Sequence, residues 1–286
     1  IWDLRTGNEL LQLTGHSARV YDAEFSPDGT QIVTAGTDGT LRLWDRKTGN
    51  ALRVFGAGDG DGLVRAVAFS PDGKHVAAGR FHVVTMWNVD NGEQVFRAEG
   101  FYQEVADVAF SPDGRSLLAP EHGRYKVHVK ELDAQTGKEL RQLAAGDGYI
   151  DSIAYSPDGS RFATGNYTGD VRIWNTETGD QLRALEGLKG PCEDVVFTPD
   201  GQSLLTGSSD MTVRMWDVAT GKEIARFGAA THATNHVSIS PNGRYAACGG
   251  GHYPPERSFF SGSWPNDGES RVFLLRLPYT DDHYLS

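Results

Sequence analysis

The sequence predicts an all-β fold, a β-propeller of four-stranded antiparallel blades. A turn of the form Ser/Thr-Pro-Asp/Asn-Gly occurs six times, and it begins at Ser26, Ser70, Ser111, Ser156, Thr198 and Ser240. Successive copies lie 41 to 45 positions apart, a period that suits a repeat of about four short strands. A second turn, Thr/Asn-Gly, recurs in step with the first, with its glycines at Gly7, Gly49, Gly92, Gly137, Gly179 and Gly221.

The chemistry of the first turn explains why it lies between two strands. Proline presets φ, the Asp or Asn side chain bonds the nearby backbone, and glycine supplies a residue of positive φ. In the first copy, the mainly apolar segments 20–25 and 31–35 flank the turn. Each turn is therefore a predicted β-hairpin.

Four strands, labelled a to d in chain order, account for each repeat. Strand a ends before the Pro-containing turn, strand b follows it, strand c comes next, and strand d follows the Thr/Asn-Gly turn. The candidates for strand c are residues 1–4, 41–45, 84–88, 127–132, 171–175, 213–217 and 271–277. The chain offers six candidates each for strands a and b but seven for strand c, so six complete blades leave one c strand over.

Two arrangements account for the additional strand. We favour seven blades, in which residues 1–13 form the outer half of a truncated first blade and residues 14–286 form six repeats. In the six-bladed alternative, residues 9–13 supply strand d of the last blade and residues 1–4 stay unpaired. Ile1 is not a methionine and lies inside a predicted strand, so we expect this single propeller domain, residues 1–286, to be a piece of a longer protein.

The c strands carry a recurring Trp. A Trp followed by Asp or Asn ends five of them, at Trp2, Trp44, Trp87, Trp174 and Trp216. Together with the two turns, this pattern resembles the WD-repeat (WD40) β-propeller family over nearly the whole chain. The resemblance implies repeats whose own chemistry is structural and a rigid platform that recognises proteins.

The resemblance also implies a structural tetrad of His, Ser/Thr, Asp and Trp, which corresponds to His16, Thr34, Asp38 and Trp44 in the first full repeat. A buried indole N–H and a buried imidazole need hydrogen-bond partners, which these side chains would supply. We therefore expect the His and the Asp to stabilise the blade rather than to form a catalytic relay. Other repeats depart from the pattern, since the fifth has Leu188 in place of the His, and we expect apolar packing to stabilise such blades.

Composition and charge narrow the partners. The chain carries 38 acidic and 27 basic residues for a net charge of −11, and its Lys and Arg residues are scattered rather than gathered in a stripe. This distribution disfavours nucleic acid and anionic membranes and favours a protein or peptide as the partner. The two cysteines, Cys192 and Cys248, lie in different repeats without a C-x-x-C motif, so they predict neither a disulfide framework nor a metal site.

The motifs of common enzymes are absent from the sequence. It contains no G-x-S-x-G, H-E-x-x-H or G-x-x-x-x-G-K-[ST], so we expect no catalytic residue, no cofactor and no metal. No stretch approaches the roughly 20 apolar residues of a membrane helix, and no signal peptide opens the chain. We expect a monomeric, cytoplasmic ring that acts as a non-catalytic scaffold. The alternative is an enzyme or small-ligand binder with a site in the central funnel, served by His236 or His252 and nearby carboxylates.

The face that carries the d–a and b–c loops is the candidate binding surface, because the turns of the opposite face are short and uniform. The resemblance implies that residues near the start of strand a and before the b–c turn point to this face: Arg19, Tyr21, Thr37, Leu63, Arg65, Glu104, Tyr149, Asp151, Tyr167, Glu193, Ser209 and Asn235. Tyr and Arg are the residue types that most often anchor interfaces. Alternatively, these residues simply line a solvated funnel.

A long b–c insertion at residues 250–270 of the last repeat opens on the same face. Its candidate contact residues are Tyr253, Phe259, Phe260 and Trp264. A loop longer than about a dozen residues is usually functional or disordered, and aromatic content argues against simple disorder. We expect these aromatic residues either to contribute to recognition or to fold back over the ring or the last blade.

Overall fold

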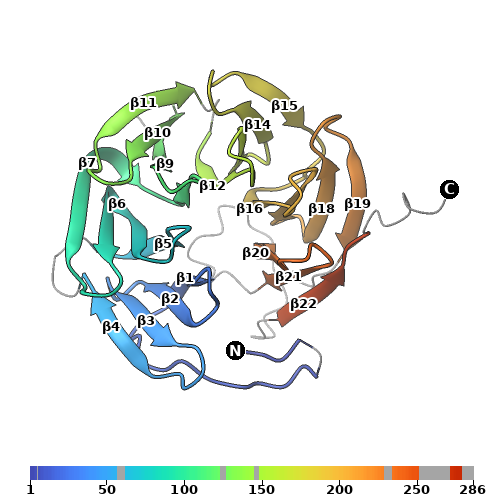
Figure 1. Ribbon diagram of the computed structural model, residues 1–286. Coiled ribbons are helices and arrows are strands. Elements are labelled where there is room, and N and C mark those ends of the chain that lie inside the picture. The colour runs from blue at the N-terminus through green and yellow to red at the C-terminus, as the bar shows by residue number, and fades with distance from the viewer. Residues whose placement is uncertain are drawn as a thin grey trace, which may run out of the picture. The chain divides into compact units, whose positions relative to one another are not determined.

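The computed structural model describes residues 1–4, 6–56, 62–122, 127–144, 148–228, 234–250 and 271–278. The described residues form strands and no helix, so none of them belongs to a helix that could cross a membrane. Their strands form six antiparallel sheets, each of which is one blade of a β-propeller (Figure 1). The chain divides into two compact units, Ile1–Tyr155 and Ser156–Ser286.

The first unit contains three sheets and the first strand of a fourth. Its strands are β1 (Val20–Phe25), β2 (Gln31–Gly36), β3 (Leu41–Asp45), β4 (Ala51–Phe55), β5 (Val64–Phe69), β6 (His75–Asn88), β7 (Gln94–Glu104), β8 (Ala109–Phe110), β9 (Ser116–His122), β10 (Val127–Asp133), β11 (Glu139–Ala144) and β12 (Ile150–Tyr155). The sheets are ordered β1-β2-β3-β4, β5-β6-β7 and β8-β9-β10-β11. Strands that follow each other in the chain are therefore neighbours in the sheet, as predicted for the a-to-d order.

The second unit continues the same pattern. Its strands are β13 (Arg161–Asn166), β14 (Val171–Asn175), β15 (Gln181–Leu185), β16 (Cys192–Phe197), β17 (Ser203–Ser208), β18 (Thr212–Asp217), β19 (Glu223–Gly228), β20 (Thr234–Ile239), β21 (Tyr245–Gly250) and β22 (Arg271–Arg276). They are ordered β12-β13-β14-β15, β16-β17-β18-β19 and β20-β21-β22. Among the described residues, the last sheet thus has strands a, b and c.

The Pro-containing turns have the predicted chemistry. In the first, the Gly29 N–H donates to the Ser26 carbonyl at 2.7 Å and Gly29 has a φ of 67°. The Ser26 hydroxyl donates to the Asp28 carboxylate at 2.6 Å, and the backbone N–H of Gln31 donates back to the Ser26 hydroxyl at 2.9 Å. The same contacts recur in the other five turns. Thr198 takes the place of the Ser in the fifth turn, and Asn242 takes the place of the Asp in the sixth. Side chains within each turn therefore stabilise the hairpin without contacts from neighbouring blades.

The six blades match the alternative count, and the favoured count of seven is wrong. Residues 1–13 do not form a further sheet, because their only described ladder contact is an isolated bridge between Trp2 and Glu9. That bridge also shows that residues 1–4 are not unpaired, as the six-bladed alternative had assumed. The segment does repeat the c–d turn, with the Gly7 N–H donating to the Asp3 carbonyl as Gly49 does to Asp45. Without inner strands beside it, a two-stranded hairpin has little to stabilise a ladder.

Two blades depart from the regular outline. In the second, β6 runs continuously through the place where strand b was expected to turn into strand c, and His82 adopts a φ of 68° there. In the third, the predicted strand a shrinks to the two residues of β8.

The core of each unit lies between neighbouring blades. In the first unit, Val33 and Leu41 of one blade form a buried cluster with Val67, Phe69 and Trp87 of the next. In the second, a similar cluster joins β17, β18, β20 and β21. Alternating apolar residues of the inner strands supply these side chains, and their burial is the main stabilising contribution to the fold.

Carboxylates near the inner edge connect successive a strands. Asp22 accepts a hydrogen bond from the Val67 N–H, Asp107 from the Ile153 N–H and Asp194 from the Val237 N–H, at 2.7 to 2.9 Å. Each Asp lies four residues before the Ser or Thr that begins its turn. The innermost strand of a sheet has unpaired N–H groups on its free edge, and these side chains satisfy one such group per contact.

Candidate functional site

Four of the predicted face residues of the first unit form one polar network around Arg65. The Arg65 guanidinium reaches Glu104 Oε2 at 3.4 Å and Asp151 Oδ1 at 3.3 Å. Its Cζ lies 5.8 Å from the centre of the Tyr21 ring. The Arg65 side chain is 19% exposed, so its charge is largely removed from water and depends on the two carboxylates. β1, β5, the end of β7 and β12 thereby hold a single charged centre.

Two arginines flank the ring of Tyr21. The Arg19 guanidinium lies 5.5 Å from the ring centre, close to the 5.8 Å of Arg65. Both distances fall in the range of a cation–π contact. Thr37, from the b–c turn of the same blade, donates its backbone N–H to the Arg19 carbonyl at 2.8 Å. The loop that carries Arg19 is thus hydrogen-bonded to the b–c turn of the same blade.

Tyr149 is fixed by a histidine that the sequence analysis missed. The rings of His122 and Tyr149 are stacked, with centres 3.7 Å apart and planes 10° from parallel. The Ile150 N–H donates to His122 Nε2 at 2.9 Å, which places the ring proton on Nδ1, where it donates to the Glu104 carbonyl at 3.3 Å. Burial lowers the pKa of His122 to about 4, so the ring is neutral at pH 7.

Two exposed aromatic residues adjoin this network and were also missed. Phe81 and Tyr102 are each 51% exposed. Phe81 is the register partner of Glu104 across β6 and β7, and Tyr102 lies two residues before Glu104. Phe81 and His122 both stand eleven residues after the Ser that begins their turn, as Thr37 does. The sequence analysis applied this position only to repeats with regular b–c turns. Applying it to the second and third repeats as well would have found Phe81 and His122.

The predicted residues of the second unit show fewer mutual contacts. The Ser209 hydroxyl donates to Glu193 Oε1 at 2.5 Å. Tyr167 is exposed on its b–c turn, and the buried Asn235 Oδ1 has no hydrogen-bond partner among the described residues. In the first unit, Leu63 is half-buried at the start of β5. Tyr253, Phe259, Phe260 and Trp264 lie outside the described residues.

The tetrad residues of the first blade are hydrogen-bonded to one another. His16 Nδ1 lies 3.0 Å from the Asp38 carboxylate, His16 Nε2 lies 2.7 Å from Thr34 Oγ1, and the Trp44 indole N–H donates to the same Thr34 oxygen at 2.9 Å. Burial raises the pKa of Asp38, but hydrogen bonds from Thr40, the Ser17 N–H and His16 outweigh it and lower that pKa to about 2. The carboxylate is therefore ionised and stabilises the blade.

An arginine replaces the missing histidine in the fifth repeat. Arg214 is buried, and its guanidinium contacts Asp210 Oδ2 at 2.7 Å, the Gly187 carbonyl at 2.7 Å and Glu223 Oε2 at 3.2 Å. The indole N–H of Trp216 still donates to Thr206 at 3.0 Å. The sequence analysis expected apolar packing to stabilise this blade, and it overlooked the basic residue two positions before the Trp.

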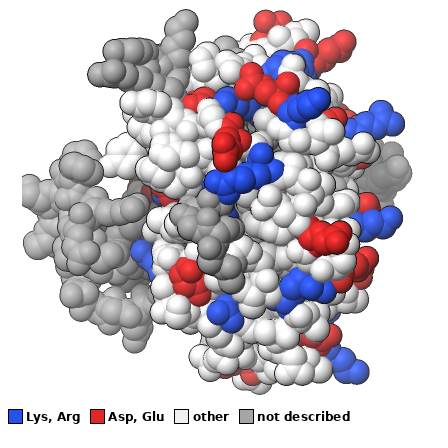
Figure 2. Space-filling model, turned by 90° about the vertical axis from the view of Figure 1, so that its left-hand side faces the viewer, with Lys and Arg blue, Asp and Glu red and all other residues white. Residues whose placement is uncertain are grey.

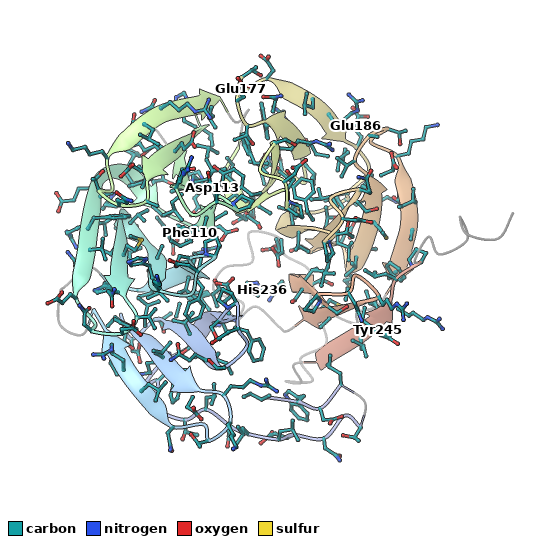
Figure 3. All side chains as sticks on the ribbon, in the orientation of Figure 1. Phe110, Asp113, Glu177, Glu186, His236 and Tyr245 are labelled. Atoms are coloured by element: carbon teal, nitrogen blue, oxygen red, sulfur yellow. The ribbon has the colours of Figure 1, made fainter. Side chains whose placement is uncertain are left out.

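One of the two histidines named for the alternative function, His236, belongs to the second unit. His236 is an exposed residue of β20 (Figure 3), and its Nδ1 is 3.8 Å from Asp194 Oδ2. The Asp194 carboxylate already accepts the Val237 N–H at 2.7 Å. His252 lies outside the described residues. On the surface visible in Figure 2, acidic and basic side chains are interspersed rather than gathered by sign.

Comparison with known proteins places the chain in a family. The repeated hairpins, the Trp–Thr hydrogen bonds and the six blades define a β-propeller of WD-type repeats. The family described as "WD domain, G-beta repeat" matches residues 7–45, 49–82, 137–175 and 179–217, more than half of the chain. The chain belongs to this family. The unmatched segment between the second and third matches contains the repeat that lacks its Trp.

Several characterised proteins are similar to parts of the chain. Eukaryotic translation initiation factor 3 subunit I of Nematostella vectensis is 29% identical over 143 residues, which cover 44% of each chain. The protein of the same name from Culex quinquefasciatus is 28% identical over 173 residues, covering 60% of this chain and 43% of the relative. Human apoptotic protease-activating factor 1 is 27% identical over 173 residues, covering 57% and 13%. The chain thus spans less than half the length of these relatives.

Proposed function

We propose that this protein recognises other proteins through the face that carries its d–a and b–c loops. In the first unit, the centre of this face is the Arg65 network with Tyr21 and Tyr149, and its exposed part includes Phe81 and Tyr102. The observation that carries the proposal is the convergence of four strands, β1, β5, β7 and β12, on Arg65, with Tyr149 held beside Glu104 by His122.

The physical argument concerns the cost of ordering side chains on binding. An interface loses affinity when flexible side chains must be immobilised, and it gains when anchors are already fixed. The Tyr149 ring stacks on His122, and the Tyr21 ring lies against the Arg65 guanidinium, so both rings are held in place before a partner binds. Exposed Phe81 and Tyr102 supply aromatic area of the kind that dominates binding energy. These features favour a protein partner over a small molecule.

The relatives support the same class of function. Translation initiation factor 3 subunit I is, by its name, one component of a larger factor. We propose that this chain likewise works as a non-catalytic member of an assembly. The carboxylate beside His236, that of Asp194, already accepts a backbone N–H, so the alternative of a catalytic funnel gains no support from this pair.

A comparison of variants in affinity capture tests the proposal. Phe81→Ala combined with Tyr102→Ala removes the exposed aromatic area, and Tyr21→Leu removes the ring beside Arg65 while leaving an apolar side chain. Both should lose the partners that the parent captures, with thermal unfolding close to that of the parent. The matched control, Leu52→Ala with Leu140→Ala, removes similarly exposed apolar side chains from β4 and β11 and should keep those partners. Equal losses in control and test variants would refute the assignment of the face.

A further inference from the structure

One backbone position of the b–c connection has the left-handed conformation in four blades. Five residues before the Trp of strand c stand Gly39, His82, Gly169 and Met211, with φ of 77°, 68°, 87° and 67°. This conformation favours glycine, because a Cβ atom crowds the backbone there. Among the residues that the structure describes, His82 and Met211 are the non-glycine residues of positive φ. Two blades therefore keep a side chain where the backbone prefers none.

This position borders the d–a loop that leads to the next blade. A Cβ atom at Gly39 would lie 3.0 Å from the Gly62 carbonyl oxygen, and one at Gly169 would lie 2.6 Å from the Gly190 carbonyl oxygen. Gly62 and Gly190 belong to the d–a loops that follow β4 and β15. The position thus lies where b–c and d–a loops meet, on the face of the proposed function.

His82 offers a hydrogen-bond acceptor on this face. The residue is exposed, and its Nδ1 lies 2.8 Å from the Phe101 carbonyl oxygen, so Nδ1 carries the proton and donates it. In the neutral ring, Nε2 is then an acceptor. The ring also packs edge to face against exposed Phe81, with the two ring centres 4.1 Å apart. His82 therefore adds a polar group beside an aromatic residue of the proposed binding face.

Met211 offers apolar contact in the second unit. It is half-buried between β17 and β18, and its backbone N–H donates to the Ser208 carbonyl at 3.1 Å, as the Gly169 N–H does to the Asn166 carbonyl at 3.0 Å. The turn thus has the same hydrogen bond with glycine or methionine, so it does not require the side chain. Methionine is flexible and polarisable, and it adapts to aliphatic and aromatic groups at binding surfaces. Strained residues of this kind cluster at binding sites.

We propose that His82 and Met211 are recognition residues of the face that carries the d–a and b–c loops. His82 accepts a hydrogen bond from the partner at Nε2, and Met211 contacts an aliphatic or aromatic side chain of the partner. The inference rests on the proposed function and adds two residues and their chemistry to the same face. It explains why two blades keep an unfavourable backbone conformation.

Thermal unfolding tests whether the Met211 side chain strains the fold. Met211→Gly removes the strain and should raise the melting temperature of the full chain by about 1–3 °C. The matched control is Gly169→Ala, which adds a Cβ atom at the same position and should lower the melting temperature. A lower melting temperature for Met211→Gly would show that the fold keeps this side chain for packing, and the role of Met211 in recognition would be overturned.

Affinity for a purified partner tests recognition itself. The probe is the most abundant protein that the parent captures from native extract, purified and titrated against each variant. Met211→Gly should weaken its Kd by about fivefold or more, although this variant is the more stable one. His82→Asn should do the same, because Asn tolerates the left-handed conformation and can donate to Phe101 but has no Nε2. The control Leu182→Ala, at an exposed residue of β15, should bind within about twofold of the parent.

The same titrations separate this inference from the proposed function. If Phe81→Ala with Tyr102→Ala weakens binding while Met211→Gly and His82→Asn bind like the parent, the proposed function stands and the assignment of His82 and Met211 is refuted. If all of these variants bind like the parent, the face itself is wrong and both are refuted.

Discussion

The carboxylate of Asp22 accepts a hydrogen bond from the backbone N–H of Val67 at 2.9 Å, and so links the first strands of two successive blades. Val67 is buried, so this N–H has no access to bulk water that could replace the contact. The link is a side chain of one repeat acting on the backbone of the next.

Asp22→Ala should therefore lower the free energy of unfolding. An unsatisfied buried N–H costs about 1–3 kcal/mol. Asp22→Asn keeps an oxygen acceptor and should lose less than the alanine variant. Urea unfolding at pH 7 measures both. If the two variants are equally destabilised, the acceptor oxygen is not the stabilising feature.

Asp38 should make the stability of the first blade fall at low pH. Its pKa is lowered to about 2 from an ordinary value of 3.8, so its contribution is fully present above pH 4 and is lost as the pH falls toward 2. At about 1.4 kcal/mol per pH unit, that contribution is on the order of 2 kcal/mol. Asp38→Ala should be less stable than the parent at pH 7.

Unfolding by urea at pH 7, 4 and 2 gives the comparison for Asp38. The difference between Asp38→Ala and the parent should shrink steadily below pH 4. A difference that stays constant across this range would mean that the ionised carboxylate contributes nothing specific.

Glu24 should have the opposite pH dependence. Glu24 is solvent-exposed on one side, yet desolvation by the surrounding protein, with a smaller effect of the neighbouring carboxylates Asp22 and Asp107, raises its pKa to about 8 although the Phe69 N–H donates to it. The folded chain then holds a proton between pH 4.5 and about 8 that the unfolded chain has released, so stability falls as the pH rises through this window. Glu24→Gln keeps an acceptor for the N–H and cannot ionise.

Thermal unfolding at pH 5 and pH 9 measures this effect. The melting temperatures of Glu24→Gln and the parent should agree at pH 5, and the variant should melt higher at pH 9. The Glu24 side chain keeps an exposed side, so solvent screening limits the gain to a few degrees at most. A variant that melts lower at pH 9 would show that the charged form stabilises the fold.

Arg214 should be among the most costly residues of the second unit to replace. Removing one partner of a buried ion pair typically costs about 3–5 kcal/mol, because the other charge is left without compensation. Arg214→Met should show such a loss, whereas Arg214→Met with Asp210→Ala should recover part of it.

A double-mutant cycle in urea isolates the coupling between Arg214 and Asp210. Arg172→Met serves as the control, because Arg172 occupies the same strand position but is more exposed and lies 3.7 Å from Asp170. It should cost less than about 1 kcal/mol. Additive effects of the two substitutions at 210 and 214 would contradict a direct stabilising contact.

The features that the sequence predicted well are those that local chemistry determines. The turn at Ser26 needs only its own hydroxyl, the Asp28 carboxylate and a glycine of positive φ, all within a few residues. Alternating apolar residues between such turns predict β-strands. The order of strands within each sheet follows from the short connections.

The features that sequence analysis missed depend on contacts between distant residues. Nothing adjacent to Leu188 indicates that Arg214 contacts the same region and neutralises Asp210. The stacking of His122 on Tyr149 joins residues from two repeats. The blade count was wrong because a strand-like pattern at residues 1–4 does not reveal whether inner strands pair with it.

The exposure of Trp2 has an optical consequence. Its indole is 56% exposed, whereas the four other described tryptophans, Trp44, Trp87, Trp174 and Trp216, are at most 4% exposed. Trp2 should emit at longer wavelength than these four and should be quenched first by acrylamide. A strand that covers the amino-terminal hairpin would shield Trp2 from water and shift its emission to shorter wavelength. The fluorescence of Trp2 therefore reports whether that hairpin is covered.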